Sequence, residues 1–386
     1  MNRITVKSPE EARAFLEMPL QLYRNDPHYI RPLDKDIDEV FDPKKNKFFR
    51  HGECERWLYR DDQGTCVGRI AVFVNKKYVV EQPTGGIGFF ECINDKALAH
   101  RMFDDAKAWL QERGMEAMDG PINFGERDRW WGLLVNGFEE PLYAMNYNPP
   151  YYRELFESYG FQVYFHQLCF GMDVSTPLSD KMHRWHDHYE ADPDFSVAHI
   201  RKDELDRFAA DFTTIYNKAW AKHGGGKTME LKQAKLIFAK MKPVIDEKIT
   251  WFVYHKGEPI AMWINIPDLN QYFKHFNGKF GWMQKLHFLY LKWTGACKRF
   301  VGVAYGVVPE WQGKGTDAYM IVECGKMVQP KERRIYDKYE MQWIGDFNPK
   351  MVNLAHNLEA HEVRRLSTYR FLFDRSREFK RHPMLG

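Results

Sequence analysis

The stretch "VAYGVVPEWQGKGTDAYMIVECGKMV", residues 303–328, decides the fold, because three kinds of local structure follow one another in it. Its apolar, valine-rich beginning predicts a strand that ends at Val308. A polar turn that contains Gly313 and Gly315 comes next, and helical spacing begins near Thr316. The segment therefore predicts a strand, a glycine-rich turn and a helix N-terminus in that order.

This order of elements suits a phosphate group. Backbone N–H groups of the turn point in one direction, and the start of the helix adds about half a positive charge. Gly313 and Gly315 have no Cβ, so an anion can approach the backbone closely. Lys314 either adds a positive charge or stays solvated. Asp317 is harmless if it points outward, but it would repel a phosphate if it pointed into the turn.

The same turn resembles the pyrophosphate-binding signature of the GNAT acyltransferase superfamily. That signature is Gln or Arg, two residues, Gly, one residue, then Gly or Ala, between a strand and a helix. Gln312 and Gly315 match its first two fixed positions, whereas Asp317 departs from the third. The resemblance implies acetyl-CoA or another acyl-CoA as co-substrate, and direct acyl transfer to an amine.

The resemblance also implies where the donor lies. The pantetheine arm would pair with the strand that ends at Val307 and Val308, and this strand would splay from the next one. The pyrophosphate would lie on the turn, whose residues are Gln312, Gly313, Lys314, Gly315, Thr316 and Asp317.

Acyl transfer to an ammonium needs a proton acceptor and a proton donor for the leaving thiolate. Within the resemblance, Glu340 in the strand "KYEMQW" is the candidate base, with a solvent-facing strand residue as the alternative. His356 stands where these enzymes often carry a tyrosine acid, with an ordinary surface histidine as the alternative. No metal site is predicted, because the histidines of "HRWHDHYE" lack a second ligand pair.

The chain is long enough for two domains, with 386 residues. "YNPPYYRELFESYGFQV" at 147 and "FNPKMVNLAHNLEAHEV" at 347 indicate an internal repeat. We therefore predict an α/β (α+β) fold of two tandem GNAT-like domains, 1–174 and 175–386, each a mixed, mostly antiparallel twisted sheet flanked by helices. In the first, "GGIGFFECIND" runs straight into a helix with Asp95 near its start, so we expect it not to hold CoA.

The net charge and the composition of the chain limit the classes of binding partner and the location that we expect. Fifty-six basic residues balance fifty-three acidic ones, which argues against a dedicated nucleic-acid or anionic-membrane binder. Six cysteines without a CxxC pair suit a reducing, cytoplasmic location, and no uncharged apolar run is long enough to span a membrane. We expect a small-molecule or peptide amine as acceptor, and neither its identity nor the oligomeric state follows from the sequence.

Two alternatives stay open. A Fem-type peptidyl transferase, which takes amino acids from transfer RNA, also pairs two such domains, but the even charge speaks against it. A catalytically decayed binding or scaffold protein is the other. "AKHGGGKT" at 221–228 fits a loose phosphate-loop pattern, but a helical pattern precedes it where that loop needs a strand.

Overall fold

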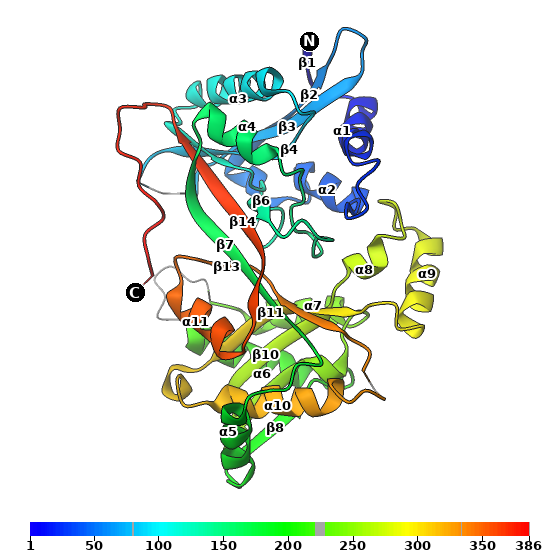
Figure 1. Ribbon diagram of the computed structural model, residues 1–386, viewed down its shortest axis with the longest axis vertical. Helices are drawn as coiled ribbons and strands as arrows, with labels where there is room; N and C mark the ends of the chain where they lie inside the picture. The colour runs from blue at the N-terminus through cyan, green and yellow to red at the C-terminus, as the bar shows by residue number, and fades with distance from the viewer. Residues whose placement is uncertain (79–80, 221–227, 333, 386) are drawn as a thin grey trace.

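The computed structural model describes residues 1–78, 81–220, 228–332 and 334–385 (Figure 1). In these residues a fourteen-stranded mixed sheet is flanked by eleven α-helices, as predicted for the α/β class. The phosphate-loop pattern at 221–228 lies almost wholly outside the described residues. No described helix has the length and apolar character needed to cross a bilayer.

The N-terminal half of the chain supplies the elements in the upper part of Figure 1. They are β1 (Asn2–Thr5), α1 (Pro9–Leu22), α2 (Asp34–Phe41), η1 (Lys47–Arg50), β2 (Gly52–Arg60), β3 (Cys66–Asn75), β4 (Thr84–Cys92), α3 (Lys96–Gln111), β5 (Ala117–Gly120), β6 (Leu133–Asn136), α4 (Tyr152–Tyr159) and β7 (Gln162–Asp173).

The C-terminal half supplies most of the lower part. Its elements are α5 (Asp180–Glu190), β8 (Phe195–His199), α6 (Leu205–Trp220), α7 (Leu231–Met241), η2 (Glu247–Ile249), β9 (Trp251–His255), β10 (Glu258–Pro267), α8 (Asn270–Phe273), α9 (Trp282–Trp293), β11 (Arg299–Val307), η3 (Pro309–Trp311), α10 (Thr316–Val328), β12 (Lys338–Met341), β13 (Ile344–Gly345), α11 (Pro349–Asn357) and β14 (His361–Leu372).

The strand order repeats in the two halves. The sheet runs β1-β2-β3-β4-β5-β14-β7-β12-β11-β10-β9-β8, so five strands of each half follow one another toward the centre. In each half, the innermost of these pairs is parallel, β4 with β5 and β11 with β12, and the others are antiparallel. A helix, α3 or α10, connects each parallel pair, as parallel strands require.

The last strand of each half lies against the other half. β14 pairs with β5, where Tyr369 faces Gly120, and β7 pairs with β12, where Tyr339 faces Met172. β7 and β14 also pair with each other over most of their length and run side by side between the two halves (Figure 1). Because the strands are exchanged, the two halves share one sheet, and a division at 174/175 stays a proposal about the sequence repeat.

The helix that follows the quoted turn is buried by this arrangement. α10 carries buried residues on several sides, among them Ala318, Met320, Val322 and Cys324, and it belongs to the large core of the C-terminal half. A helix that is apolar on several sides is stable only when other elements cover it. Packing of α10 against the sheet therefore holds its N-terminus at the end of β11.

Candidate functional site

The strand before the quoted turn has an open edge. β11 pairs with β12 only from Arg299 to Gly302, and the last bond runs from the Gln342 amide to the Gly302 carbonyl at 3.0 Å. From Ala304 to Val307, the strand pairs with β10 on its other side, and no described strand occupies the free side. A strand edge of this kind offers unpaired N–H and C=O groups to an incoming chain of amides.

The two glycines of the turn have different surroundings. Gly313 has φ of 73° and Gly315 has φ of 72°, both in the left-handed region that favours glycine. A Cβ on Gly313 would have no atom within 4 Å, whereas a Cβ on Gly315 would lie 2.5 Å from the Trp185 ring. Gly313 therefore faces open space, and Gly315 is required by the packing of α5 on the turn.

The remaining residues of the turn hold its shape. The Gln312 amide nitrogen donates to the Val307 carbonyl at 3.0 Å, so this side chain closes the turn on β11. Lys314 is exposed, and its ammonium lies 4.9 Å from the centre of the Trp311 ring. Thr316 is buried at the start of the helix. Lys314 thus supplies an exposed positive charge at the turn.

Asp317 is turned toward β11. Burial, the negative charge of Asp317 and a hydrogen bond to its carboxylate together raise the pKa of Tyr305 well above its ordinary value. Because Tyr305 belongs to β11, this contact directs the carboxylate at the strand. The position that departs from the GNAT signature therefore carries a carboxylate with a protein partner of its own.

The corresponding strand pair of the first half also opens. β4 pairs with β5 only from Thr84 to Gly86. Here, however, side chains of the protein take the amides: the Tyr152 hydroxyl accepts from the Cys92 amide at 2.7 Å, and Asp95 accepts from the Leu98 amide at 3.0 Å. The first half thus lacks the free helix start that follows β11.

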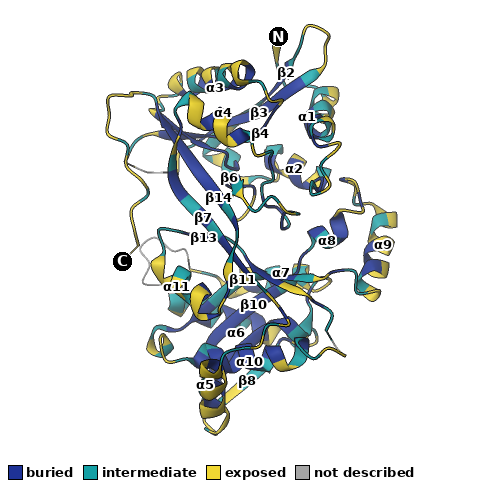
Figure 2. Ribbon diagram, in the orientation of Figure 1, coloured by how far each residue is buried: buried dark blue, intermediate teal, exposed yellow. Residues whose placement is uncertain are grey.

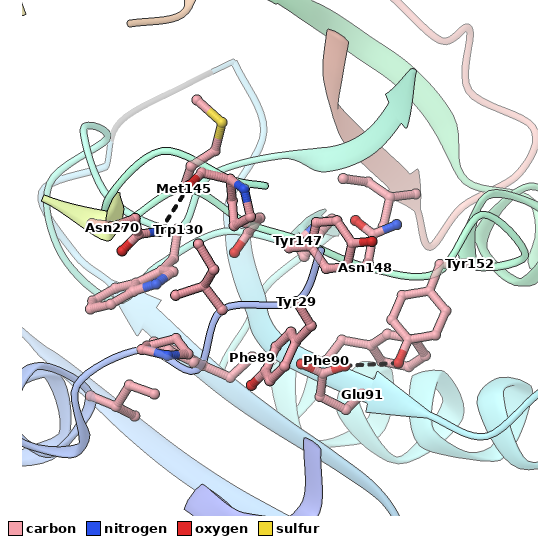
Figure 3. Close-up of a pocket in the computed structure, with 18 of the residues that line it drawn as sticks. Tyr29, Phe89, Phe90, Glu91, Trp130, Met145, Tyr147, Asn148, Tyr152 and Asn270 are labelled. Carbon is pink, nitrogen blue, oxygen red and sulfur yellow. Dashed lines mark hydrogen bonds between the residues drawn. The ribbon is translucent and has the colours of Figure 1, made fainter. Parts of the chain in front are cut away.

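A cavity of about 750 Å³, counting the solvent at its mouth, lies beside β4 (Figure 3). Among the residues that the structure describes, Asn270 of α8 is the one that lines it from the C-terminal half. Aromatic side chains make up much of its wall: Tyr29, Phe89, Phe90, Trp130, Tyr143, Tyr147 and Tyr152. This lining is typical of a site for a small, largely apolar ligand.

Glu91 is the carboxylate in the wall of this cavity. It is 7% exposed, and it accepts from the hydroxyls of Tyr23 at 2.8 Å and Tyr152 at 2.9 Å and from Arg69 at 3.3 Å. Burial raises the pKa of Glu91, because it outweighs the nearby arginine and the hydroxyl donors. Sequence analysis missed this residue, although an acidic residue within the apolar strand "GGIGFFECI" was an available signal.

Glu340 lies elsewhere, inside a cluster of ion pairs. It is 4% exposed, and its oxygens accept from Arg364 at 3.1 Å and from Arg299 at 3.2 Å. Both arginines also donate to the Glu140 carbonyl. Glu340 therefore holds two guanidinium groups that fix the loop leading into residues 141–148, most of which line the cavity.

His356 is exposed on α11, where its ring packs edge-on against Phe170 with 5.1 Å between centroids. No hydrogen bond or ion pair in the described part of the chain joins it to Glu340. The structure thus keeps the two candidate catalytic residues in separate surroundings, and their roles stay predictions.

One apolar cluster connects the two regions. Val301 of β11 belongs to it together with Leu142 and Met145. Met145 also lines the cavity (Figure 3). β11 and the cavity therefore share one packed junction between the halves.

The chain was compared with protein families, with known proteins and with solved structures. No protein-family model matches the chain. It is similar to the bacterial ceramide synthase of Caulobacter vibrioides, at 26% identity over 95% of this chain and 96% of that protein. It is also similar to protein YghO of Escherichia coli, at 25% identity over 95% of this chain and 94% of that protein.

Among solved structures, a tandem GNAT protein from the clavulanic acid biosynthesis pathway superposes with a TM-score of 0.53 at 10% identity. The superposition covers 97% of this chain and 99% of that one, so it extends over both halves. The chain therefore has the tandem GNAT fold.

Proposed function

We propose that this protein is an N-acyltransferase that transfers an acyl group from acyl-CoA to the amine of a long-chain amino alcohol. The observation that carries the proposal is the likeness to the bacterial ceramide synthase, because it extends over nearly the whole of both chains. A ceramide is the amide of a fatty acid and a long-chain amino alcohol, so the proposed reaction forms the same kind of bond.

The donor is placed at the open edge of β11. Its pantetheine amides pair with the backbone up to Val307 and Val308, and its pyrophosphate lies on the residues 312–317. Two observations support this placement: no strand in the described part of the chain pairs with the edge of β11 that faces away from β10 beyond Gly302, and the Asp317 carboxylate has a protein partner in Tyr305. Gly313 is the position in the turn where an anion can approach the backbone, because no atom lies within 4 Å of the place where its Cβ would be.

A second, almost wholly apolar cavity offers room for the acyl chain. Its volume is about 460 Å³, counting solvent at the mouth, and it lies between α10 and the sheet, with walls that include Phe300, Ile321, Val328 and Tyr339. An acyl chain leaving the end of the pantetheine arm would bury its methylene groups there, each contributing about 0.8 kcal/mol.

The acceptor is placed in the aromatic cavity. Its walls suit an alkyl chain, and Glu91 and the aromatic rings suit an ammonium group. The nitrogen lone pair attacks the thioester carbonyl, the C–N bond forms and the C–S bond breaks, and CoA leaves as a thiol after taking up a proton. We assign Glu91 to bind the ammonium and accept its proton, since a raised pKa favours proton uptake. Glu340 then positions the loop 137–141 through its arginines.

The test is turnover with purified protein, a fatty acyl-CoA and sphinganine. Thiol release is followed with a chromogenic reagent, and the amide is identified by mass spectrometry. We expect sphinganine to be acylated and ethanolamine, which has the amino alcohol without the chain, to be acylated far more slowly. Equal rates with both amines, or thiol release without an amide, would contradict the assignment of the acceptor.

A matched pair of variants tests the cavity. Glu91→Gln should raise KM for sphinganine at least tenfold and leave KM for acyl-CoA nearly unchanged. Tyr143→Phe is the control, because Tyr143 lines the same cavity but its hydroxyl donates to Asp36 at 2.7 Å, whereas the described hydrogen-bond partners of Glu91 are Tyr23, Tyr152 and Arg69. An unchanged KM for sphinganine in the Glu91 variant would place the acceptor elsewhere.

A further inference from the structure

α9 exposes an apolar stripe to solvent. Along one side of the helix the spacing is 282, 286, 289 and 293, with 283 and 290 beside it. The exposed fractions are 72% for Trp282, 60% for Met283, 59% for Leu286, 59% for Leu289, 59% for Tyr290 and 84% for Trp293. Large exposed apolar patches are rare on proteins that act alone in water, and they mark interaction sites.

The opposite side of α9 holds the helix on the protein. Phe288 and Leu291 are buried there, and the Phe288 ring packs on Tyr272 of α8 with 4.9 Å between centroids. Lys292 donates to the Pro243 carbonyl at 2.6 Å. In Figure 2 the helix stands at the margin of the molecule, away from the sheet, with exposed residues along it. The apolar stripe thus belongs to a fixed helix and points outward.

The α8–α9 region is rich in positive charge, although one of its lysines, Lys274, is paired with Glu140 at 3.1 Å. Residues 270–298, which we call the α8–α9 segment, contain five lysines and no Asp or Glu, although the whole chain has a net charge of only +3. Lys274, Lys279, Lys285 and Lys298 are exposed. A surface that combines this charge with a row of large apolar side chains complements an anionic and apolar partner.

We propose that the α8–α9 segment docks on an anionic lipid bilayer, with α9 lying in the plane of the headgroups. Tryptophan at both ends of the stripe and Tyr290 beside it are the residue types that favour the membrane–water interface. The lysines contact anionic headgroups while the stripe enters the acyl boundary. The near-balance of basic and acidic residues in the whole chain argues against a membrane binder. That balance is an average, however, and it hides the positive charge that is concentrated in the α8–α9 segment.

Continuity with the aromatic cavity favours a bilayer over a protein partner. Asn270, the first residue of the segment, lines the cavity and donates to the Pro141 carbonyl at 2.9 Å. Phe273 packs on Tyr143, another lining residue, with 5.3 Å between centroids. This argument rests on the proposed function, since a long-chain amine resides in membranes, whereas the stripe and its charge do not depend on it.

The experiment is flotation of the full chain with phosphatidylcholine vesicles, with and without phosphatidylglycerol, in the absence of any substrate. We expect binding to the vesicles that contain phosphatidylglycerol. Trp282→Ser with Trp293→Ser should reduce binding at least tenfold, and Met384→Ser with Leu385→Ser, which removes exposed apolar side chains from the C-terminal tail, should not.

Charge variants give the second readout. Lys279→Gln with Lys285→Gln should weaken binding about 25-fold at low salt, or about fivefold per lysine, and raised salt should shrink that difference. No binding to either vesicle overturns the proposal, whatever the turnover assay shows. So does a dimer in light scattering that the Trp282 and Trp293 change converts to monomer, because the stripe would then belong to an interface between two copies.

Discussion

The donor site can be tested with one matched pair of substitutions at Gly313. Gly315 is unsuitable, because any Cβ there meets Trp185 and a loss of binding would only report a disturbed turn. At Gly313 the space is open, and the φ of 73° is one that Asn and Asp adopt more readily than other side chains. Gly313→Asn and Gly313→Asp therefore share shape and backbone strain and differ only in charge.

The size of the effect follows from Coulomb's law. Two unit charges at about 4 Å repel by about 4 kcal/mol where the effective dielectric constant is about 20, and by about 1 kcal/mol in bulk water. Gly313 is exposed, so the lower part of this range applies. We expect the Asp variant to bind acyl-CoA about 1–2 kcal/mol more weakly than the Asn variant, which is about 5- to 30-fold in Kd.

Isothermal titration calorimetry with CoA and acyl-CoA measures this difference directly. It should shrink as salt is raised, because the charges are solvent-exposed. Unfolding temperatures of the free variants should agree, which controls for the fold. Equal affinity of the two variants would refute the placement of the pyrophosphate on this turn, and wild-type protein that binds no CoA would refute the donor assignment as a whole.

Two further predictions concern buried carboxylates. Glu340→Gln should lower the free energy of unfolding by about 3 kcal/mol, because it leaves Arg364 without a buried partner charge, while Arg299 keeps its ion pair with Asp268. Glu362→Gln, which breaks a more exposed pair, should cost less than about 1 kcal/mol in the same denaturant titration. A Glu340→Gln variant that kept the full stability of the wild type would contradict this role of the ion pairs. Glu91 has a pKa raised above its usual value of 4.5, so its contribution to stability is complete below about pH 4.5 and is lost as pH rises through the raised value. The stability of wild type relative to Glu91→Gln should therefore fall from about pH 4.5 upward, and a difference that does not change with pH would contradict the raised pKa.

The sequence by itself determined the local elements and the fold. Apolar runs, helical spacing and the glycine turn at 313–315 depend on neighbours a few residues apart, so they can be read from the chain directly. The two similar segments that begin at 147 and 347 can also be recognised directly in the sequence, and they predicted a tandem arrangement. The open edge of β11 was expected from the GNAT resemblance, and the strand register agrees with it.

Only the tertiary structure decided what surrounds the residues of the site. Glu340 and Glu91 both lie in strands, and spacing along a strand does not reveal that one meets two arginines while the other meets a cavity. The sequence also did not reveal that β7 and β14 each pair with the other half. Each of these strands would bury the same face if it paired within its own half, so its pattern of apolar residues would be the same. Local pattern fixes which side chains turn inward, but long-range packing chooses their partners, and those partners set the charge and chemistry of each group.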